Sequence, residues 1–282
     1  NIQKIDATDA KKANKIALVA LNSGANGLCF SNPNNLELLL KDIKTEYIKT
    51  DFIDTDVSFI LELQEYCNKN ILIGSLESNN SFEIKNVTKK ITVNGKTVKE
   101  EIRNAFEIGK KTNGKIEFHF TIGKNFFFEI AKLRAFRILW KSQTNQDPFI
   151  TTSTSKKNQS SGVNNIFKTT TECISAILGG TNALITNAHD SDYSEYNDLS
   201  SRVARNQFNV LTQESHLNKV KDTGRGSYYI EYLTEEFLKE FDVNIKDSTI
   251  KKNSEYSTNE NILIKEYYNK EDLAELEHLD SI

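Results

Sequence analysis

Short runs rich in β-forming residues alternate with helical patterns through most of this 282-residue chain. The alternation is typical of repeated βα units, whose strands form a parallel sheet covered by helices. An eighth strand in Ser81 to Val87 would complete a closed (β/α)8 barrel of the TIM type, and an open doubly wound sheet fits the pattern nearly as well. The seven strands that the pattern predicts directly are Gly27 to Phe30, Ile48 to Ile53, Ile71 to Leu76, Lys90 to Asn94, Ile116 to Ile122, Phe149 to Ser153 and Ala183 to Thr186.

Four stripes of apolar residues with helical spacing predict helices between these strands. The first runs from Ala10 to Leu21 and has Gly24 just past its end, where a left-handed residue is favoured. The others are Phe126 to Trp140, Ile166 to Leu178 and Leu199 to Thr212. Their apolar faces are predicted to form core rather than binding sites.

The composition and length fit one large barrel followed by a polar extension. At 38% hydrophobic residues the chain has enough apolar material for a sizeable core, and α/β barrels commonly reach ~250 residues as one domain. Beyond about Val243 the chain is charged and rich in Asn and Ser before a final helical stretch. We therefore predict a barrel domain over residues 1–242 and a polar C-terminal arm or linker over residues 243–282.

Charge and patterning argue against nucleic-acid and membrane partners. The 36 Lys and Arg residues nearly balance 39 Asp and Glu residues, and no basic run is present. The longest apolar stretches, such as Ile71 to Ile73, are far below the ~20 residues that span a bilayer, and the polar start lacks a signal-peptide pattern. These features predict a cytoplasmic protein. Three scattered cysteines outside any CxxC pair predict reduced thiols and no zinc site: Cys29, Cys67 and Cys173.

Common catalytic motifs are absent from the sequence, and its histidines are isolated. His189 follows a predicted strand, at the end where barrel enzymes carry their chemistry, but the adjacent Asp190 would point away from it. The other three, His119, His216 and His278, are predicted to be packed or solvated.

Two further groups of polar residues can each be interpreted in two ways. The loop Gln159 to Gly162 offers amide and hydroxyl donors to a ligand, or it is a flexible loop in which Ser161 or Asn164 caps the next helix. Four arginines on predicted helices fit ion pairs inside the chain or across an interface: Arg134, Arg137, Arg202 and Arg205.

Four blocks together resemble the barrel domain of methylmalonyl-CoA mutase, in order and in spacing. They are Lys124 to Trp140 (KNFFFEIAKLRAFRILW), Thr169 to Asp190, Ser200 to Ser215 and Gly224 to Thr234. The resemblance is strong from about residue 115 to 234. It is weaker at the start, where ANKIALVALNSGANGLCF resembles the opening helix and first strand of that barrel. The small, or beta, subunit of the two-chain bacterial enzyme is the most similar form.

The resemblance implies an isomerase that interconverts methylmalonyl-CoA and succinyl-CoA by radical chemistry with adenosylcobalamin. In such an enzyme the barrel encloses the acyl-CoA, and a separate C-terminal domain carries the cobalamin. The stretch that follows Thr234 is too short for such a domain, and no Asp-x-His-x-x-Gly motif is present. The resemblance also aligns Gln159 with a loop glutamine that faces the cofactor, and Asn187 with the asparagine after the eighth strand. Both are candidate cofactor-binding residues.

This chain departs from the catalytic pattern at two places. Catalytic members carry a Tyr-His turn after the fifth strand, whereas Gly95 to Glu100 contains neither residue. The donor that would polarise the substrate thioester carbonyl is therefore missing. An arginine and a serine that help to hold CoA correspond here to Lys115 and Glu117, and a carboxylate at that place would repel CoA phosphates. We expect no catalytic residue on this chain.

Three hypotheses follow. The first is a non-catalytic small-subunit-like barrel that stabilises a mutase large subunit as a heterodimer, with adenosylcobalamin held by the complex rather than by this chain. The second is an active acyl-CoA mutase barrel that works with a cobalamin domain on another chain, with His189 or Gln159 replacing the missing donors. The third is a barrel that has drifted into ligand binding or a purely structural role.

Overall fold

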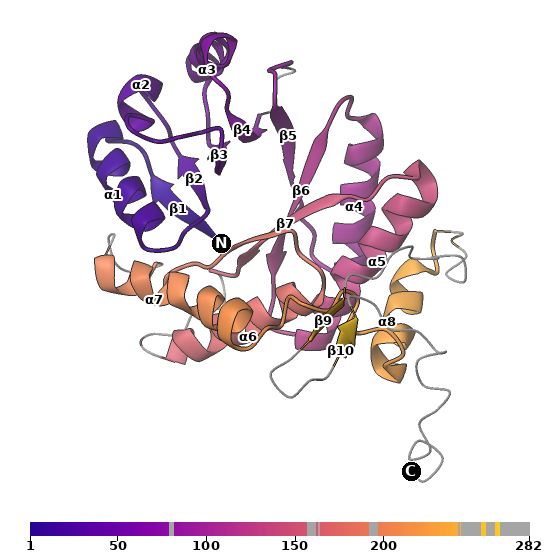
Figure 1. Cartoon of the computed structure of the whole chain (residues 1–282). Coiled ribbons are helices and arrows are strands. Elements are labelled where there is room, and N and C mark those ends of the chain that lie inside the picture. The colour runs from indigo at the N-terminus through magenta and orange to yellow at the C-terminus, as the bar shows by residue number, and fades with distance from the viewer. Residues whose placement is uncertain are drawn as a thin grey trace.

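The computed structural model describes residues 1–78, 82–156, 162, 164–191, 197–241, 243, 255–257 and 263–265. Within them, eight parallel strands form a closed barrel in chain order, with β1 paired to both β2 and β8 (Figure 1). The predicted (β/α)8 barrel is confirmed and the open sheet is excluded. The strands are β1 (Ile2–Asp6), β2 (Gly27–Ser31), β3 (Lys49–Ile53), β4 (Ile73–Glu77), β5 (Val87–Thr92), β6 (Ile116–Ile122), β7 (Phe149–Thr154) and β8 (Ala183–Ile185).

Helices surround the barrel on its outside (Figure 1). The four predicted helices are confirmed as α1, α5, α6 and α7, the last continuing into a π-helical turn, η1. Side-chain caps fix where several begin: Asp9 accepts from the Lys12 amide at 3.0 Å, and Asp56 from the Phe59 amide at 2.8 Å. The helices are α1 (Ala10–Asn22), α2 (Leu36–Leu39), α3 (Val57–Lys69), α4 (Val98–Lys111), α5 (Phe126–Thr144), α6 (Asn164–Leu178), α7 (Asp198–Asn209), η1 (Val210–Glu214) and α8 (Tyr228–Leu238).

The predicted position of the eighth strand is wrong. Residues 82–86 form no strand, and Val87 begins β5, while the strand that completes the barrel is β1 at the start of the chain. The sequence Ile2–Asp6, IQKID, hides this strand because buried parallel strands usually read as continuous apolar runs. Consequently the early segment that resembles an opening helix and first strand folds as α1 and β2.

The apolar core lies between the strands and the helices rather than inside the barrel. Phe118 on β6 stacks edge-on against Phe136 and Trp140 of α5, with ring centroids 4.8 and 4.7 Å apart. Gly109 allows α4 to approach this group, since a Cβ there would lie 2.6 Å from the Trp140 ring. Gly24 ends α1 with φ of +92°, as its position in the sequence predicts.

Little of the predicted arm falls within the described residues. Two short antiparallel strands, β9 (Glu255–Ser257) and β10 (Leu263–Lys265), pair with each other. The final helical stretch lies outside the described residues. The boundary at residues 242 and 243 stays a prediction.

Candidate functional site

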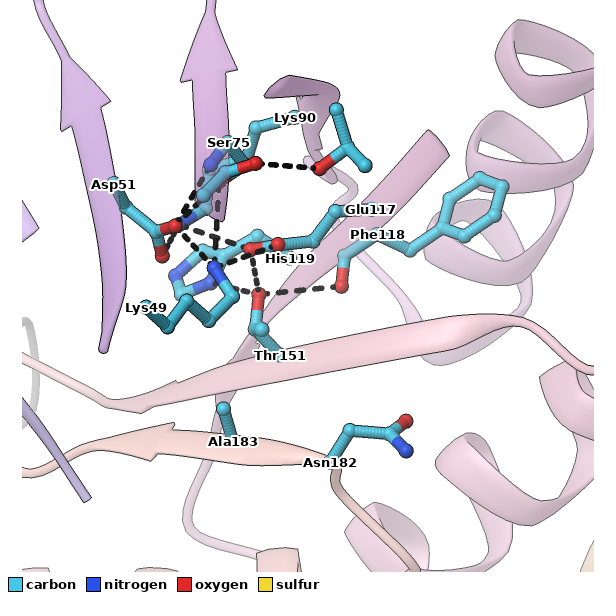
Figure 2. Close-up of polar contacts among 12 residues, drawn as sticks. Lys49, Asp51, Ser75, Lys90, Glu117, Phe118, His119, Thr151, Asn182 and Ala183 are labelled. Carbon is cyan, nitrogen blue, oxygen red and sulfur yellow. Dashed lines mark hydrogen bonds and ion pairs between the residues drawn. The ribbon is translucent and has the colours of Figure 1, made fainter. Parts of the chain in front are cut away.

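Four charged side chains from three strands meet inside the barrel. Alternation along each strand turns Lys49 and Asp51 of β3, Lys90 of β5 and Glu117 of β6 toward the lumen, where Figure 2 shows them converging. Lys90 Nζ lies 3.0 Å from Asp51 Oδ2 and 3.2 Å from Glu117 Oε1. Lys49 Nζ lies 2.7 Å from Glu117 Oε2 and also pairs with Asp51. These residues form a closed ion-pair ring with two positive and two negative charges.

The ring is buried, which strengthens its internal attractions. The side chains of Asp51, Lys90 and Glu117 are at most 1% exposed, and that of Lys49 is 19% exposed. Burial by itself would raise the pKa of Asp51, but the ammonium groups of Lys90 and Lys49 lower that pKa to about 2. Burial would likewise lower the pKa of Lys90, but the carboxylates of Asp51 and Glu117 outweigh it and raise that pKa. Asp51 and Lys90 are therefore charged at neutral pH.

A chain of hydrogen bonds extends from the ring toward the carboxyl ends of the strands. Thr151 Oγ1 donates to Glu117 Oε1 at 2.9 Å, and it lies 3.0 Å from His119 Nδ1. Because the single hydroxyl proton of Thr151 goes to the carboxylate, Thr151 accepts from His119 Nδ1–H. His119 Nε2 then accepts from Ser153 Oγ, 3.1 Å away. Burial and the charge of Lys90 hold the pKa of His119 well below its usual value, so the imidazole is neutral.

Sequence reasoning missed most of this site. His119 looked isolated because its partners, Thr151 and Ser153, belong to the neighbouring strand β7. Lys49, Asp51 and Lys90 were not singled out, although a charged residue within a strand otherwise predicted to be buried is a signal for such a site. Glu117 was singled out as a lone carboxylate that repels phosphate. The structure instead compensates its charge with two lysines from distant parts of the chain.

The residues predicted to face the cofactor are only partly described. Asn187 lies two residues after β8 and is buried. Its amide nitrogen donates to the Thr154 carbonyl, and its backbone N–H donates to Thr154 Oγ1 at 2.9 Å. This internal bonding gives no support to a cofactor contact through its amide nitrogen, and its role stays a prediction. Gln159, like Ser161, lies outside the described residues.

His189 and Asp190 are not brought together as a catalytic pair. The Asp190 carboxylate accepts from Ser200 Oγ at 2.7 Å. His189 is half-buried, and its Nδ1 has no hydrogen-bond partner in the described structure. Asn164 is the first residue of α6.

Three of the four arginines make contacts within the chain. Arg134 donates from Nε to Asp222 at 2.6 Å and forms a two-point contact with Glu231 at 2.8 and 2.9 Å. Arg137 donates to backbone carbonyls, including that of Gly180 at 2.7 Å. Arg205 is buried and donates to the Gln3 side chain at 2.9 Å. These contacts favour the interpretation that the three arginines bind groups inside the chain rather than across an interface. Arg202, in contrast, is exposed.

A cavity of about 340 Å³ lies at the amino-terminal mouth of the barrel. Lys49 of the ring forms part of its wall, together with Phe149 and Phe208. Amide side chains from the loops at this end complete it, among them Asn26 and Asn182. The ring therefore stands between this cavity and the carboxyl end of the lumen.

The described ranges contain neither a metal-binding cluster nor a helix that could span a membrane. Among those residues no three His, Cys, Asp or Glu side chains are grouped so that they could hold a metal ion. None of the helices described above combines the length and the apolar character that crossing a bilayer requires.

Comparison with known proteins shows which sequences this chain is similar to. Residues 94–250 match the family model described as methylmalonyl-CoA mutase. The chain is 40% identical over 152 residues to a methylmalonyl-CoA mutase of Rhizobium meliloti, a match that covers 49% of this chain and 21% of that protein. It is 39% identical over 132 residues to a methylmalonyl-CoA mutase small subunit of Porphyromonas gingivalis, covering 43% of this chain and 21% of the relative. It is 40% identical over 131 residues to a probable large subunit of Mycobacterium bovis, with 43% and 18% covered.

These matches span about a fifth of the length of the relatives. The family match begins just after β5 and includes β6, β7 and β8, so it contains Glu117 of the ring and the His119 to Ser153 contact. The structure also has the closed eight-stranded parallel barrel that the resemblance implies. The chain belongs to the methylmalonyl-CoA mutase family.

Proposed function

We propose that the chain is a small-subunit-like, non-catalytic barrel that stabilises the large subunit of a methylmalonyl-CoA mutase. The ion-pair ring carries this proposal. The family resemblance implies that a catalytic barrel encloses acyl-CoA, and here the ring fills the lumen with four of the protein's own side chains. Opening the ring for a ligand would leave buried charges unpaired, at a cost of about 3–5 kcal/mol.

The missing donors support the same proposal. The segment Gly95 to Glu100 enters α4 directly, and Thr97 caps that helix by accepting from the Glu100 amide at 3.2 Å. His119 does face the lumen, but its two ring nitrogens are engaged by Thr151 and Ser153. It therefore does not replace the histidine that would polarise a thioester carbonyl in a catalytic member.

The cofactor and partner follow from the proposal. Adenosylcobalamin, held by the complex rather than by this chain, would supply the radical chemistry. Relatives named small and large subunit both match the chain, which supports a two-chain assembly. We propose a cytoplasmic heterodimer with an interface above ~2,000 Å², as is usual for permanent complexes.

Co-expression with a mutase large subunit from the same cell tests the proposal. We expect the two chains to elute together in size-exclusion chromatography at micromolar concentration. We expect mutase activity from the pair with adenosylcobalamin and none from this chain alone. Separate elution would contradict the proposal and favour a drifted barrel. Turnover by this chain with only a cobalamin domain added would favour the active-barrel alternative.

A further inference from the structure

Three Asn-Gly dipeptides lie in very different surroundings in this fold. They are Asn26-Gly27, Asn94-Gly95 and Asn113-Gly114. In such a dipeptide the backbone nitrogen of the glycine can attack the side-chain carbonyl carbon of the asparagine, because glycine has no Cβ to obstruct the approach. The reaction also needs freedom of the peptide that joins the two residues. The local structure therefore decides which of the three dipeptides can react.

The Asn113-Gly114 dipeptide lies in the loop that joins α4 to β6. Both of its residues are exposed. Gly114 has φ of +89°, and a Cβ built on it would meet no atom within 4 Å. Among the residues that the structure describes, neither Asn113 nor Gly114 finds a hydrogen-bond partner, through its backbone or its side chain. The Asn113 side chain and the Gly114 nitrogen are therefore free to meet.

The loop is held only at its two ends. Before the dipeptide, the Thr112 N–H donates to the Gly109 carbonyl at 3.1 Å, and the Thr112 hydroxyl donates to the Ile108 carbonyl at 2.9 Å. After it, the Lys115 carbonyl accepts from the Lys89 N–H at 3.0 Å. The two residues between these bonds can change conformation without breaking the helix or the sheet.

The Asn94-Gly95 dipeptide is also exposed, but hydrogen bonds on both sides hold it in place. Its asparagine carbonyl accepts from the Asn104 side chain at 2.7 Å, and the N–H of the next residue, Lys96, donates to the Glu100 carboxylate at 2.8 Å. A Cβ on its glycine would lie 2.7 Å from the backbone nitrogen of Glu101, so the chain is closely packed there. Rotation of this peptide must first break hydrogen bonds.

The Asn26-Gly27 dipeptide is protected by the sheet. Gly27 is buried at the start of β2, in register with Ile2 of β1 and with Lys49 of β3. A Cβ on it would lie 3.1 Å from the Lys49 carbonyl oxygen. The Gly27 nitrogen can move only when β2 separates from its neighbours, and core strands open only near global unfolding.

We propose that Asn113-Gly114 is a site of spontaneous deamidation in the folded protein and that the fold protects the other two dipeptides. A base in the solvent takes the proton of the Gly114 N–H, and the nitrogen attacks Asn113 Cγ. The new C–N bond forms, the Cγ–Nδ2 bond breaks, and ammonia leaves with the proton that the base returns. Water then opens the succinimide at either of its carbonyls and gives aspartate or isoaspartate. No oxidant or reductant takes part.

The surroundings of the loop accommodate the product. Lys111, in the last turn of α4, and Lys115 flank the dipeptide. They attract the new carboxylate and so offset its unfavourable place near the carboxyl end of a helix. The formal net charge of −3 becomes more negative by one unit. The modified chain is therefore expected to stay folded and to be separable by charge.

Ageing of the full chain in a mildly alkaline buffer tests the site. Peptide mapping by mass spectrometry follows each dipeptide with time, through the mass gain that the exchange of NH2 for OH produces. We expect Asn113 to convert at least about 10-fold faster than Asn94 or Asn26, because those two react only after local opening. In guanidinium chloride, where the fold is lost, the three rates should become similar.

Three variants locate the reaction. Asn113→Gln should remove the fast conversion and leave one species in anion-exchange chromatography, because glutamine would have to form a larger ring and reacts slowly. Gly114→Ala should slow the conversion, because the added methyl group obstructs the attack. Asn94→Gln is the matched control and should leave the conversion of Asn113 unchanged.

Two outcomes would overturn the proposal. One is conversion of Asn94 or Asn26 in the folded protein as fast as that of Asn113, which would refute protection by the fold. The other is an unchanged Asn113 in the folded protein after a period that converts the denatured chain. Circular dichroism checks that each variant is folded, and if Asn113→Gln is not, the comparison of the three dipeptides in wild type still decides. None of these measurements involves a large subunit, so their result is independent of the function proposed above.

Discussion

Lys90 Nζ lies 3.0 Å from Asp51 Oδ2, although 39 residues and one intervening strand separate the two residues. Both side chains point into the lumen of a barrel whose apolar core lies outside it, between strands and helices. This pair and its counterpart between Lys49 and Glu117 make the centre of the barrel polar and closed. At the level of the ring, the lumen is therefore held by paired charges, beside the small apolar cluster of Ile2, Cys29 and Ile185.

Replacing Lys90 with Met should destabilise the fold by about 3–5 kcal/mol, because Asp51 and Glu117 would then be buried with one ammonium between them. Urea unfolding measures the loss. Lys89→Met is the control, because Lys89 precedes Lys90 on β5 and forms no ion pair in the described structure, so it should change stability by less than about 0.5 kcal/mol. Equal effects of the two substitutions would contradict the central role of the ring.

Glu172 should make the protein less stable as pH rises through the neutral range. Burial raises the pKa of this carboxyl to about 7 although it accepts from the Ser155 amide, so the folded state retains a proton that the unfolded state releases near pH 4.5. Between these two values the folded state holds more protons, so stability falls with increasing pH.

The Glu172→Gln variant removes that titration and can still accept from the Ser155 amide. We expect it to gain on the order of 2 kcal/mol over wild type at pH 8 and to show no gain at pH 4.5. Thermal unfolding from pH 4.5 to 8 provides the comparison. Asp51 does not interfere, because its lowered pKa of about 2 confines its loss of stabilisation to more acidic pH. Parallel pH profiles for the two proteins would rule out this role of Glu172.

Arg134→Lys should cost about 2 kcal/mol despite preserving the charge. Arg134 holds Glu231 of α8 with two nitrogens and Asp222 with a third, and a lysine cannot reproduce that planar arrangement. Arg202→Lys is the control, because Arg202 is exposed. If Arg134→Lys leaves the melting temperature unchanged and instead weakens association with a large subunit, the interface reading of this arginine is correct.

Gly74→Ala should cost more than about 3 kcal/mol or prevent folding. A Cβ at residue 74 would lie 1.7 Å from the backbone oxygen of Thr50, and a backbone atom cannot move aside as a side chain can. Gly114→Ala meets no atom within 4 Å and carries only the strain of its φ of +89°, about 1 kcal/mol. Circular dichroism and urea unfolding of both variants measure the difference.

Succinyl-CoA should not bind the isolated chain with micromolar affinity. The ring closes the lumen, and Glu117 at this level is already paired with Lys49 and Lys90, so no free cation of the ring is available to the ligand. Isothermal titration calorimetry is the measurement. A dissociation constant of about 1 μM, or roughly −8 kcal/mol, would show that a working acyl-CoA channel persists.

The sequence by itself predicted the alternation of strands and helices and pointed to the family, but it left the closed barrel and the open sheet as alternatives. Local patterns predicted β2 to β8 and the helices α1, α5, α6 and α7, because amphipathic periodicity and caps depend only on near neighbours in the chain. Four blocks of residues sufficed to identify the family. β1 was missed, and a strand was predicted instead at residues 81–87, since IQKID lacks the apolar run expected of a buried parallel strand.

Only the tertiary structure showed that a ring of ion pairs occupies the centre of the barrel. Lys49, Lys90 and Glu117 lie far apart in the sequence, and each by itself is an ordinary charged residue. Closing the barrel brings both lysine ammonium groups to about 3 Å from the Glu117 carboxylate, where the low dielectric strengthens the pairing. The charge balance inside the barrel therefore depends on several strands together and cannot be read from any one of them.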